Sequence, residues 1–184
     1  IDLAPSAYYY NNRADFYQDQ GNYDEALLDY ATAIEISTDD WQTSRALHQR
    51  ANIYWEQDKL DLCIEEYSQA IKISPSAAKF CNRATSYQEL KNYEKALDDF
   101  QSAIDLDNEN PKLYEYRGDC YIEMEDYTNA LKDLDKTIDL APSAYYYNNR
   151  ADFYKSQGNY DKSLLDYTTA IGISTDDRQT SRAL

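Results

Sequence analysis

The chain has 184 residues, 34 acidic and 18 basic side chains, a net charge of −16 at pH 7 and 20 tyrosines. Its 42% hydrophobic content is enough to form a core and excludes global disorder. The negative charge excludes a nucleic-acid backbone or an anionic membrane surface as the main partner. No apolar run approaches the roughly 18 residues that a membrane span requires. Three scattered cysteines indicate a reducing compartment, and we expect the cytoplasm.

The sequence of residues 1–47 is repeated almost unchanged in residues 138–184, with seven differences among 47 positions. This duplication has a period of 137 residues. It indicates that the chain is part of a repeated array.

A shorter period lies inside the duplication. A short motif occurs five times: an arginine, then directly an alanine or glycine, then a tyrosine three positions after that small residue. Its arginines are Arg13, Arg50, Arg83, Arg117 and Arg150. A second apolar segment follows each of these arginines, with small and aromatic residues three and four positions apart. That spacing predicts helices, so each unit is expected to form two helices of about 13 residues.

The predicted elements follow one another in register along the chain. Residues 1–5 are expected to end a preceding unit and residues 181–184 to begin a sixth. The complete units are predicted at 7–40, 44–77, 77–110, 111–144 and 144–177. An acidic residue often opens the second helix of a unit, as at Asp24 and Glu94, where it suits the positive helix N-terminus. Three extra residues, 41–43 and again 178–180, predict longer or more extended junctions after the first and fifth units.

The pattern resembles the tetratricopeptide repeat, a 34-residue helix–turn–helix with aromatic, small and proline residues at fixed offsets. The resemblance covers essentially the whole chain in five copies. It implies an all-α fold: a right-handed superhelical solenoid of antiparallel helix pairs. The units depart from the family pattern in having arginine where leucine usually precedes the small residue.

The repeated residues are expected to serve packing first. Small residues such as Ala14 and Ala33 allow neighbouring helices to approach, and 15 of the 20 tyrosines fall at recurrent aromatic positions. The other tyrosines are Tyr8, Tyr9, Tyr116, Tyr145 and Tyr146.

Each repeated arginine has an acidic residue 16 positions later. The acids are Asp29, Glu66, Asp99, Asp133 and Asp166. This ladder predicts ion pairs, either between the two helices of one unit or between adjacent units. A row of ligand-binding arginines is the alternative interpretation.

The family resemblance implies a concave groove, lined by the first helix of each unit, that binds an extended peptide or a partner helix. The groove residues would be Tyr8, Asn11, Asn12, Asp15 and Asp19; Arg45, His48, Gln49, Asn52 and Glu56; Cys81, Asn82, Thr85 and Glu89; Lys112, Glu115, Tyr116, Asp119 and Glu123; and Tyr145, Asn148, Asn149, Asp152 and Lys155. Asparagine has both a donor and an acceptor, so it can bind a peptide backbone without reading its sequence. A merely solvated helix face is the alternative.

One sub-family uses two lysines, two asparagines and an arginine to hold the C-terminal carboxylate of heat-shock chaperones. Asn52, Asn82 and Lys112 match that set, but His48 and Tyr116 stand where cations are usual. Eight acids in the groove would also repel an acidic tail. A basic or neutral peptide is therefore the expected ligand.

The sequence gives little indication of a catalytic site. His48 is the only histidine and has no recognisable nucleophile partner, and no glycine-rich phosphate loop is present. Cys63 and Cys120 are expected to pack in the core, whereas Cys81 could face the groove. We expect neither a cofactor nor a metal.

The leading hypothesis is a non-enzymatic protein-interaction scaffold. Two alternatives remain open. The chain could self-associate head to tail through uncapped ends, as part of a longer array, or it could be a regulatory segment of a larger protein. The absence of an initiator methionine favours a processed or excised chain.

Overall fold

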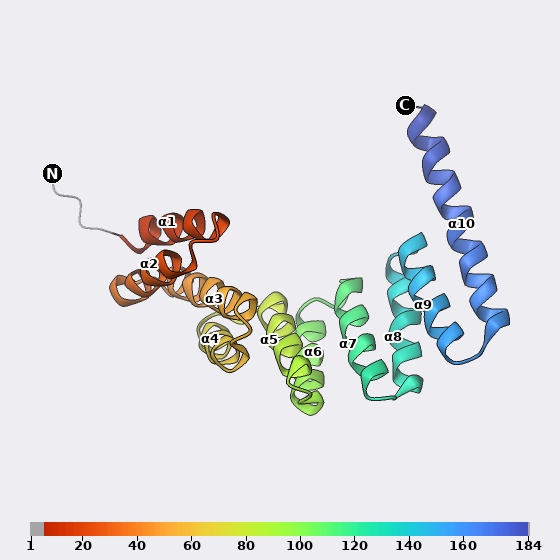
Figure 1. The fold of residues 1–184 in the computed structure, drawn as a ribbon, viewed down its shortest axis with the longest axis horizontal. Coiled ribbons are helices and arrows are strands. Elements are labelled where there is room, and N and C mark those ends of the chain that lie inside the picture. The colour runs from red at the N-terminus through yellow and green to blue at the C-terminus, as the bar shows by residue number, and fades with distance from the viewer. Residues whose placement is uncertain (1–5, 184) are drawn as a thin grey trace. The chain divides into compact units, whose positions relative to one another are not determined.

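The structure is a computed structural model that describes residues 6–183, with side chains described up to Ser174. Within that range the chain forms ten α-helices and no β-strand, which confirms the expected all-α class (Figure 1). The helices are α1 (Ala7–Asp19), α2 (Tyr23–Ile36), α3 (Asp40–Glu56), α4 (Leu60–Ile73), α5 (Ala77–Glu89), α6 (Tyr93–Leu106), α7 (Pro111–Glu123), α8 (Tyr127–Leu140), α9 (Ala144–Ser156) and α10 (Tyr160–Ala183).

The helices pack as consecutive pairs: α1 with α2, α3 with α4, α5 with α6, α7 with α8 and α9 with α10. We call the odd-numbered member of each pair the first helix and the even-numbered member the second helix. The chain divides into two compact units, one up to Leu106 and one from Asp107 onward. In the first unit α2 packs on α3 and α4 on α5, and α1 also contacts α3; in the second unit α8 packs on α9.

Helix starts follow the local sequence. The expected acidic residues lie in the first turns of α2, α4, α6 and α10, where they favour the helix dipole. Ser76 and Ser143 accept backbone hydrogen bonds at the starts of α5 and α9, and Asn110 does so before α7. Pro111 is at the first position of α7, where its missing N–H has no cost.

Each pair turns through one residue with a left-handed backbone. Gly21 and Gly158 have φ of 74° and 72°, and Asp58, Lys91 and Glu125 have φ of 57°, 57° and 60°. The residue after each of them donates its N–H to a carbonyl in the last turn of the first helix, as Asn22 does to Tyr17 at 2.9 Å. This is the hydrogen bond of a left-handed helix cap, and it fixes the tight turn within the pair.

The core is built from the small residues that the sequence indicated. Ala14 and Ala33 are fully buried, as are their counterparts in the next pairs. At Gly118 an added Cβ would lie 3.4 Å from the Cβ of Asp133, so α7 and α8 are in close contact there. Small side chains therefore set the helix separation, and the aromatic rings fill the space on either side.

The expectation of longer junctions is wrong. Residues 41–43 lengthen α3 at its start, because Asp39 accepts the N–H of Trp41 and caps the helix before them. Residues 178–180 lie within the continuous helix α10, which also contains residues 181–183 of the predicted sixth repeat. Residues 1–5, predicted to end a preceding repeat, lie outside the described residues, as does Leu184. No helix in the described part of the chain is both long enough and apolar enough to cross a membrane.

Candidate peptide-binding surface

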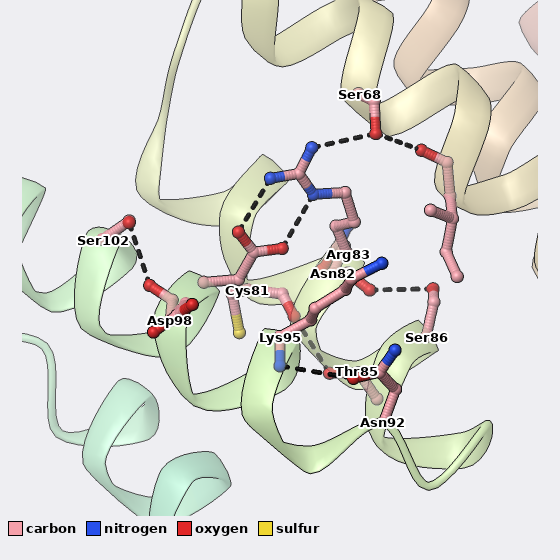
Figure 2. A network of polar contacts seen from close by, with 12 residues as sticks. Ser68, Cys81, Asn82, Arg83, Thr85, Ser86, Asn92, Lys95, Asp98 and Ser102 are labelled. Atoms are coloured by element: carbon pink, nitrogen blue, oxygen red, sulfur yellow. Dashed lines mark hydrogen bonds and ion pairs between the residues drawn. The ribbon is translucent and has the colours of Figure 1, made fainter.

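The repeated arginines join the two helices of each pair. In four pairs the Nε and Nη2 atoms of the arginine each donate to one carboxylate oxygen of the aspartate 16 residues later, at 2.6–2.8 Å. The predicted ion pairs are thus confirmed, and each joins the two helices of one pair. Arg83 also donates through Nη1 to Ser68 of the preceding pair at 2.8 Å (Figure 2), and Arg150 does the same to Asp135 at 2.7 Å.

Arg50 and Glu66 form the exception in this ladder. Only one bond joins them, from Nη2 to Oε1 at 2.7 Å, while Arg50 Nε and Glu66 Oε2 are buried without a hydrogen-bond partner. Burial raises the pKa of Glu66, and the nearby Arg50 opposes that shift. The extra methylene of glutamate therefore replaces a two-bond contact by a single bond.

Tyrosine hydroxyls form a second ladder, which the sequence reading missed. Tyr30 donates to Asp15 at 2.6 Å, and Tyr67 and Tyr167 donate in the same way to Asn52 and Asp152. Each bond spans 15 residues, from a second helix to the open face of a first helix. The aromatic positions had been assigned to packing alone, and the constant 15-residue separation was the signal that could have revealed the bonds.

Two pairs lack this hydroxyl. Phe100 and Leu134 occupy the tyrosine position in α6 and α8. The corresponding first-helix residues are Thr85 in α5 and Asp119 in α7. Asp119 is therefore the acid of this series that no tyrosine stabilises.

In the first unit the predicted groove residues bind one another. Arg45 forms an ion pair with Asp15 and lies 3.4 Å from the amide oxygen of Asn12. Asn82 contacts the ring of His48 at 3.3 Å. Burial lowers the pKa of His48, and the charge of Lys79 adds to that effect. Polar contacts between neighbouring first helices thus satisfy much of this surface.

In the second unit, α7 and α9 enclose an open pocket of about 430 Å³. We call it the acidic pocket; its lining residues are Glu115, Asp119, Ile122, Tyr145, Asn149, Asp152, Phe153 and Ser156. Glu115 accepts from the hydroxyl of Tyr145 at 2.6 Å and from the amide of Asn149 at 3.0 Å. Burial, assisted by Glu115 and Glu123, raises the pKa of Asp119 to about 6.

In the described part of the chain, no cationic side chain forms an ion pair with an acid of the acidic pocket. Among the described residues, Glu115, Asp119 and Asp152 form no ion pair. Three carboxylates with two neutral donors between them make a site of negative potential, in which an ammonium or guanidinium group would be stabilised.

The predicted groove residues differ in exposure. The exposed ones are Tyr8, Asn12, Asp19, Glu56, Glu89, Lys112, Tyr116, Asp119, Glu123, Tyr145, Asn148, Asp152 and Lys155. The half-buried ones are Asp15, Arg45, His48, Gln49, Asn52, Asn82, Thr85 and Asn149. Asn11, Cys81 and Glu115 are buried.

Asn11 and Cys81 differ from the expectation of an open groove, whereas Glu115, although buried, still lines the acidic pocket. Asn11 is fully buried, because its amide donates to the backbone oxygen of Gln42 at 3.2 Å and to the side-chain oxygen at 2.8 Å, which ties α1 to α3. Cys81 is also covered, and burial raises the pKa of its thiol to about 11, so it is a poor nucleophile. Cys63 and Cys120 pack in the core as expected.

A search of the described residues finds no cluster of three histidine, cysteine or acidic side chains placed to hold a metal ion.

Comparisons with known protein families match the chain from residue 5 to residue 177. Sequence models of the tetratricopeptide repeat match residues 5–76, 77–110, 111–143 and 144–177. No curated protein matches the sequence.

Solved structures share the fold. A crystal structure of the protein MamA superposes with a TM-score of 0.81 at 18% identity, covering 96% of each chain. MamA from Desulfovibrio magneticus RS-1 gives 0.79 at 15% identity, covering 92% of this chain and 96% of that one. YrrB, described as a TPR protein with an unusual peptide-binding site, gives 0.70 at 20% identity and covers 95% and 91%. With family models matching from residue 5 to residue 177, the chain belongs to the tetratricopeptide repeat family.

Proposed function

We propose that the protein is a non-enzymatic interaction scaffold that binds an extended basic or neutral peptide along the open faces of its first helices. In the second unit, the acidic pocket would take a lysine or arginine side chain of that peptide. The observation that carries the proposal is Asp119, a carboxylate in a three-acid pocket with neither a counter-ion nor a tyrosine donor.

The chemistry of the pocket favours a cation for a simple reason. An ionised carboxylate that is partly withdrawn from water is costly, and its raised pKa reports that cost. A ligand ammonium group would stabilise the ionised carboxylate, and the cost of ionisation that it removes would contribute to the binding free energy. Asn149 and Tyr145 hold Glu115 in place beside it, so little ordering would be needed on binding.

The remainder of the surface supports backbone recognition. Asn12 and Asn148 are exposed on first helices, and an asparagine amide can both donate to and accept from a peptide unit. An acidic C-terminal tail is a poorer ligand, because the net charge of −16 opposes it. We place this function in the cytoplasm, in keeping with three thiols that form no disulfide.

The test uses a blocked heptapeptide of alternating glycine and lysine, and a second peptide with glutamate in place of lysine. Calorimetry should detect binding of the lysine peptide only. Asp119→Asn should weaken that binding about tenfold, as expected for the loss of one charge-assisted contact. Asp139→Asn, which removes an exposed acid of α8 in the same unit, is the matched control and should have little effect. Equal losses from both variants would refute the pocket as the binding site.

A further inference from the structure

The duplication places the same residues in two different environments. Residues 7–36 form α1 and α2, and their copies form α9 and the first part of α10. α9 has α8 packed against it, and α2 has α3 packed against it. Differences in exposure between identical residues therefore show which side chains a neighbouring pair covers.

One face of α1 is exposed although its copy in α9 is buried. Tyr9 is 66% exposed and Phe16 61%, whereas Tyr146 and Phe153, their copies, are 9% and 7% exposed. Phe153 is buried against Ala130 and Leu134 of α8, and Leu131 also packs there. The ring of Tyr127 meets it edge-on at 6.1 Å. We call Tyr9 and Phe16 the α1 face.

One face of α10 is exposed in the complementary way. Leu164 is 67% exposed, whereas Leu27, its copy in α2, packs against the cluster that contains Ile53 of α3. Tyr160 and Ile171 are 70% and 66% exposed, and their copies Tyr23 and Ile34 pack against the same cluster. We call Tyr160, Leu164 and Ile171 the α10 face.

Two residues of the α10 face correspond to the α8 residues that cover Phe153, the copy of Phe16. Residues 33 places apart are equivalent in α8 and α10, so Tyr160 corresponds to Tyr127 and Leu164 to Leu131. In the second unit the α8 residues cover Phe153, which is the copy of Phe16. The α10 face therefore has the residue types that cover the α1 face at the junction the protein already contains.

We propose that the α10 face of one copy of this chain binds the α1 face of a second copy, head to tail. Leu164 and Tyr160 of the first copy would cover Phe16 of the second as Leu131 and Tyr127 cover Phe153. This interface is separate from the peptide-binding surface, which lies on the open faces of the first helices.

Two physical consequences follow from this geometry. The two faces differ, so each copy has one of each and the contact does not close on itself; association is open-ended and grows with concentration. Each copy carries a charge of −16, so added salt, which screens the repulsion, should strengthen association.

The chain supplies a matched control for the α10 face. Leu165 is 66% exposed and adjoins Leu164, but its copy Leu28 is 68% exposed although the next pair is present, so this position lies off the interface. Leu164→Asp and Tyr9→Asp should disrupt association, whereas Leu165→Asp should not.

Sedimentation velocity of the 184-residue chain, run over a wide concentration range in 0.15 M and 0.5 M NaCl, tests the proposal. The sedimentation coefficient should rise with concentration and with salt. Leu164→Asp and Tyr9→Asp should each lower the association constant at least about tenfold, because a carboxylate would be buried in an apolar contact. Circular dichroism should show that each variant keeps its helices, since both positions are exposed.

Mixing provides the decisive measurement. Leu164→Asp retains an intact α1 face, and Tyr9→Asp retains an intact α10 face, so each variant alone should be monomeric but an equimolar mixture should form a one-to-one dimer. A monomer at all concentrations for the unchanged chain would overturn the proposal. Association of either variant with itself, or an equal loss in the Leu165→Asp control, would also overturn it.

Discussion

The hydroxyl of Tyr30 donates to the carboxylate of Asp15 over 2.6 Å and links the buried face of α2 to the open face of α1. Burial and the bond to Asp15 raise the pKa of Tyr30 well above its usual value, so the hydroxyl keeps its proton. Packing and surface chemistry are thus coupled through one side chain. Where the hydroxyl is missing, as at Leu134, the acid on the open face has no tyrosine donor.

Tyr30→Phe should therefore lower the free energy of unfolding by about 1 kcal/mol, the usual contribution of one hydrogen bond of this kind. Phe100 occupies the same position in α6 and is fully buried, so the ring alone packs without difficulty. Urea denaturation measures the change. Tyr17→Phe is the control, because the Tyr17 hydroxyl has no hydrogen-bond partner in the described part of the chain; an equal loss in that variant would contradict the assignment.

Glu66→Asp should stabilise the protein by about 0.5–1.5 kcal/mol. Aspartate gives the two-bond contact with arginine in the other four pairs, and here it would satisfy the buried Nε of Arg50. The reverse change, Asp99→Glu, should break one of the two bonds to Arg83 and destabilise the protein. Thermal unfolding of both variants checks the prediction, and a destabilised Glu66→Asp protein would argue against it.

Lys91→Gly should raise the free energy of unfolding by about 0.5–1 kcal/mol. Lys91 has φ of 57°, a left-handed conformation that is unfavourable for side chains with a Cβ. Gly158→Ala tests the same cost in the opposite direction: nothing lies within 4 Å of the added Cβ, so only the backbone conformation is affected. If the two substitutions shift stability in the same direction, this explanation of the turns is incorrect.

The raised pKa of Asp119 gives a pH dependence with a definite sign. Its folded-state pKa of about 6 lies above the unfolded value, so the folded protein binds the extra proton and gains stability as the pH falls from about 7 toward 4. Asp119→Asn should be more stable than the unchanged chain at pH 7.5, by less than about 1 kcal/mol because the exposed side chain is screened by solvent. The difference should vanish near pH 4, as denaturation at several pH values would show.

Most of the architecture could be predicted from the sequence, because it repeats. The periodic arginines and aspartates predicted the ion pairs, and the small residues predicted the close helix contacts. The structure placed residues 41–43 inside α3 because Asp39 caps the helix, a local bond that periodicity does not encode. Asn11 is buried because α3 covers it, whereas its copy Asn148 is exposed; identical sequence cannot distinguish the two.

The acidic pocket shows the same limit. Its acids were predicted to lie on one surface, but the special position of Asp119 depends on Leu134, a core residue in another helix. The missing tyrosine hydroxyl is recognised only from the 15-residue separation between Asp119 and Leu134. Asp119 is thus distinguished by its contacts with a neighbouring helix and not by its own place in the repeat.

The proposed function is that the first-helix surface binds a basic peptide, with the acidic pocket as the cation site. The most direct measurement is an NMR titration of the 184-residue chain at pH 7.5 with the glycine–lysine heptapeptide. The amide shifts should be concentrated at Glu115, Asp119, Asn149 and Asp152, and they should weaken at pH 5 as Asp119 takes up its proton. Shifts spread evenly over exposed acids such as Asp139, no shifts at all, or equal shifts with the glutamate peptide would contradict it.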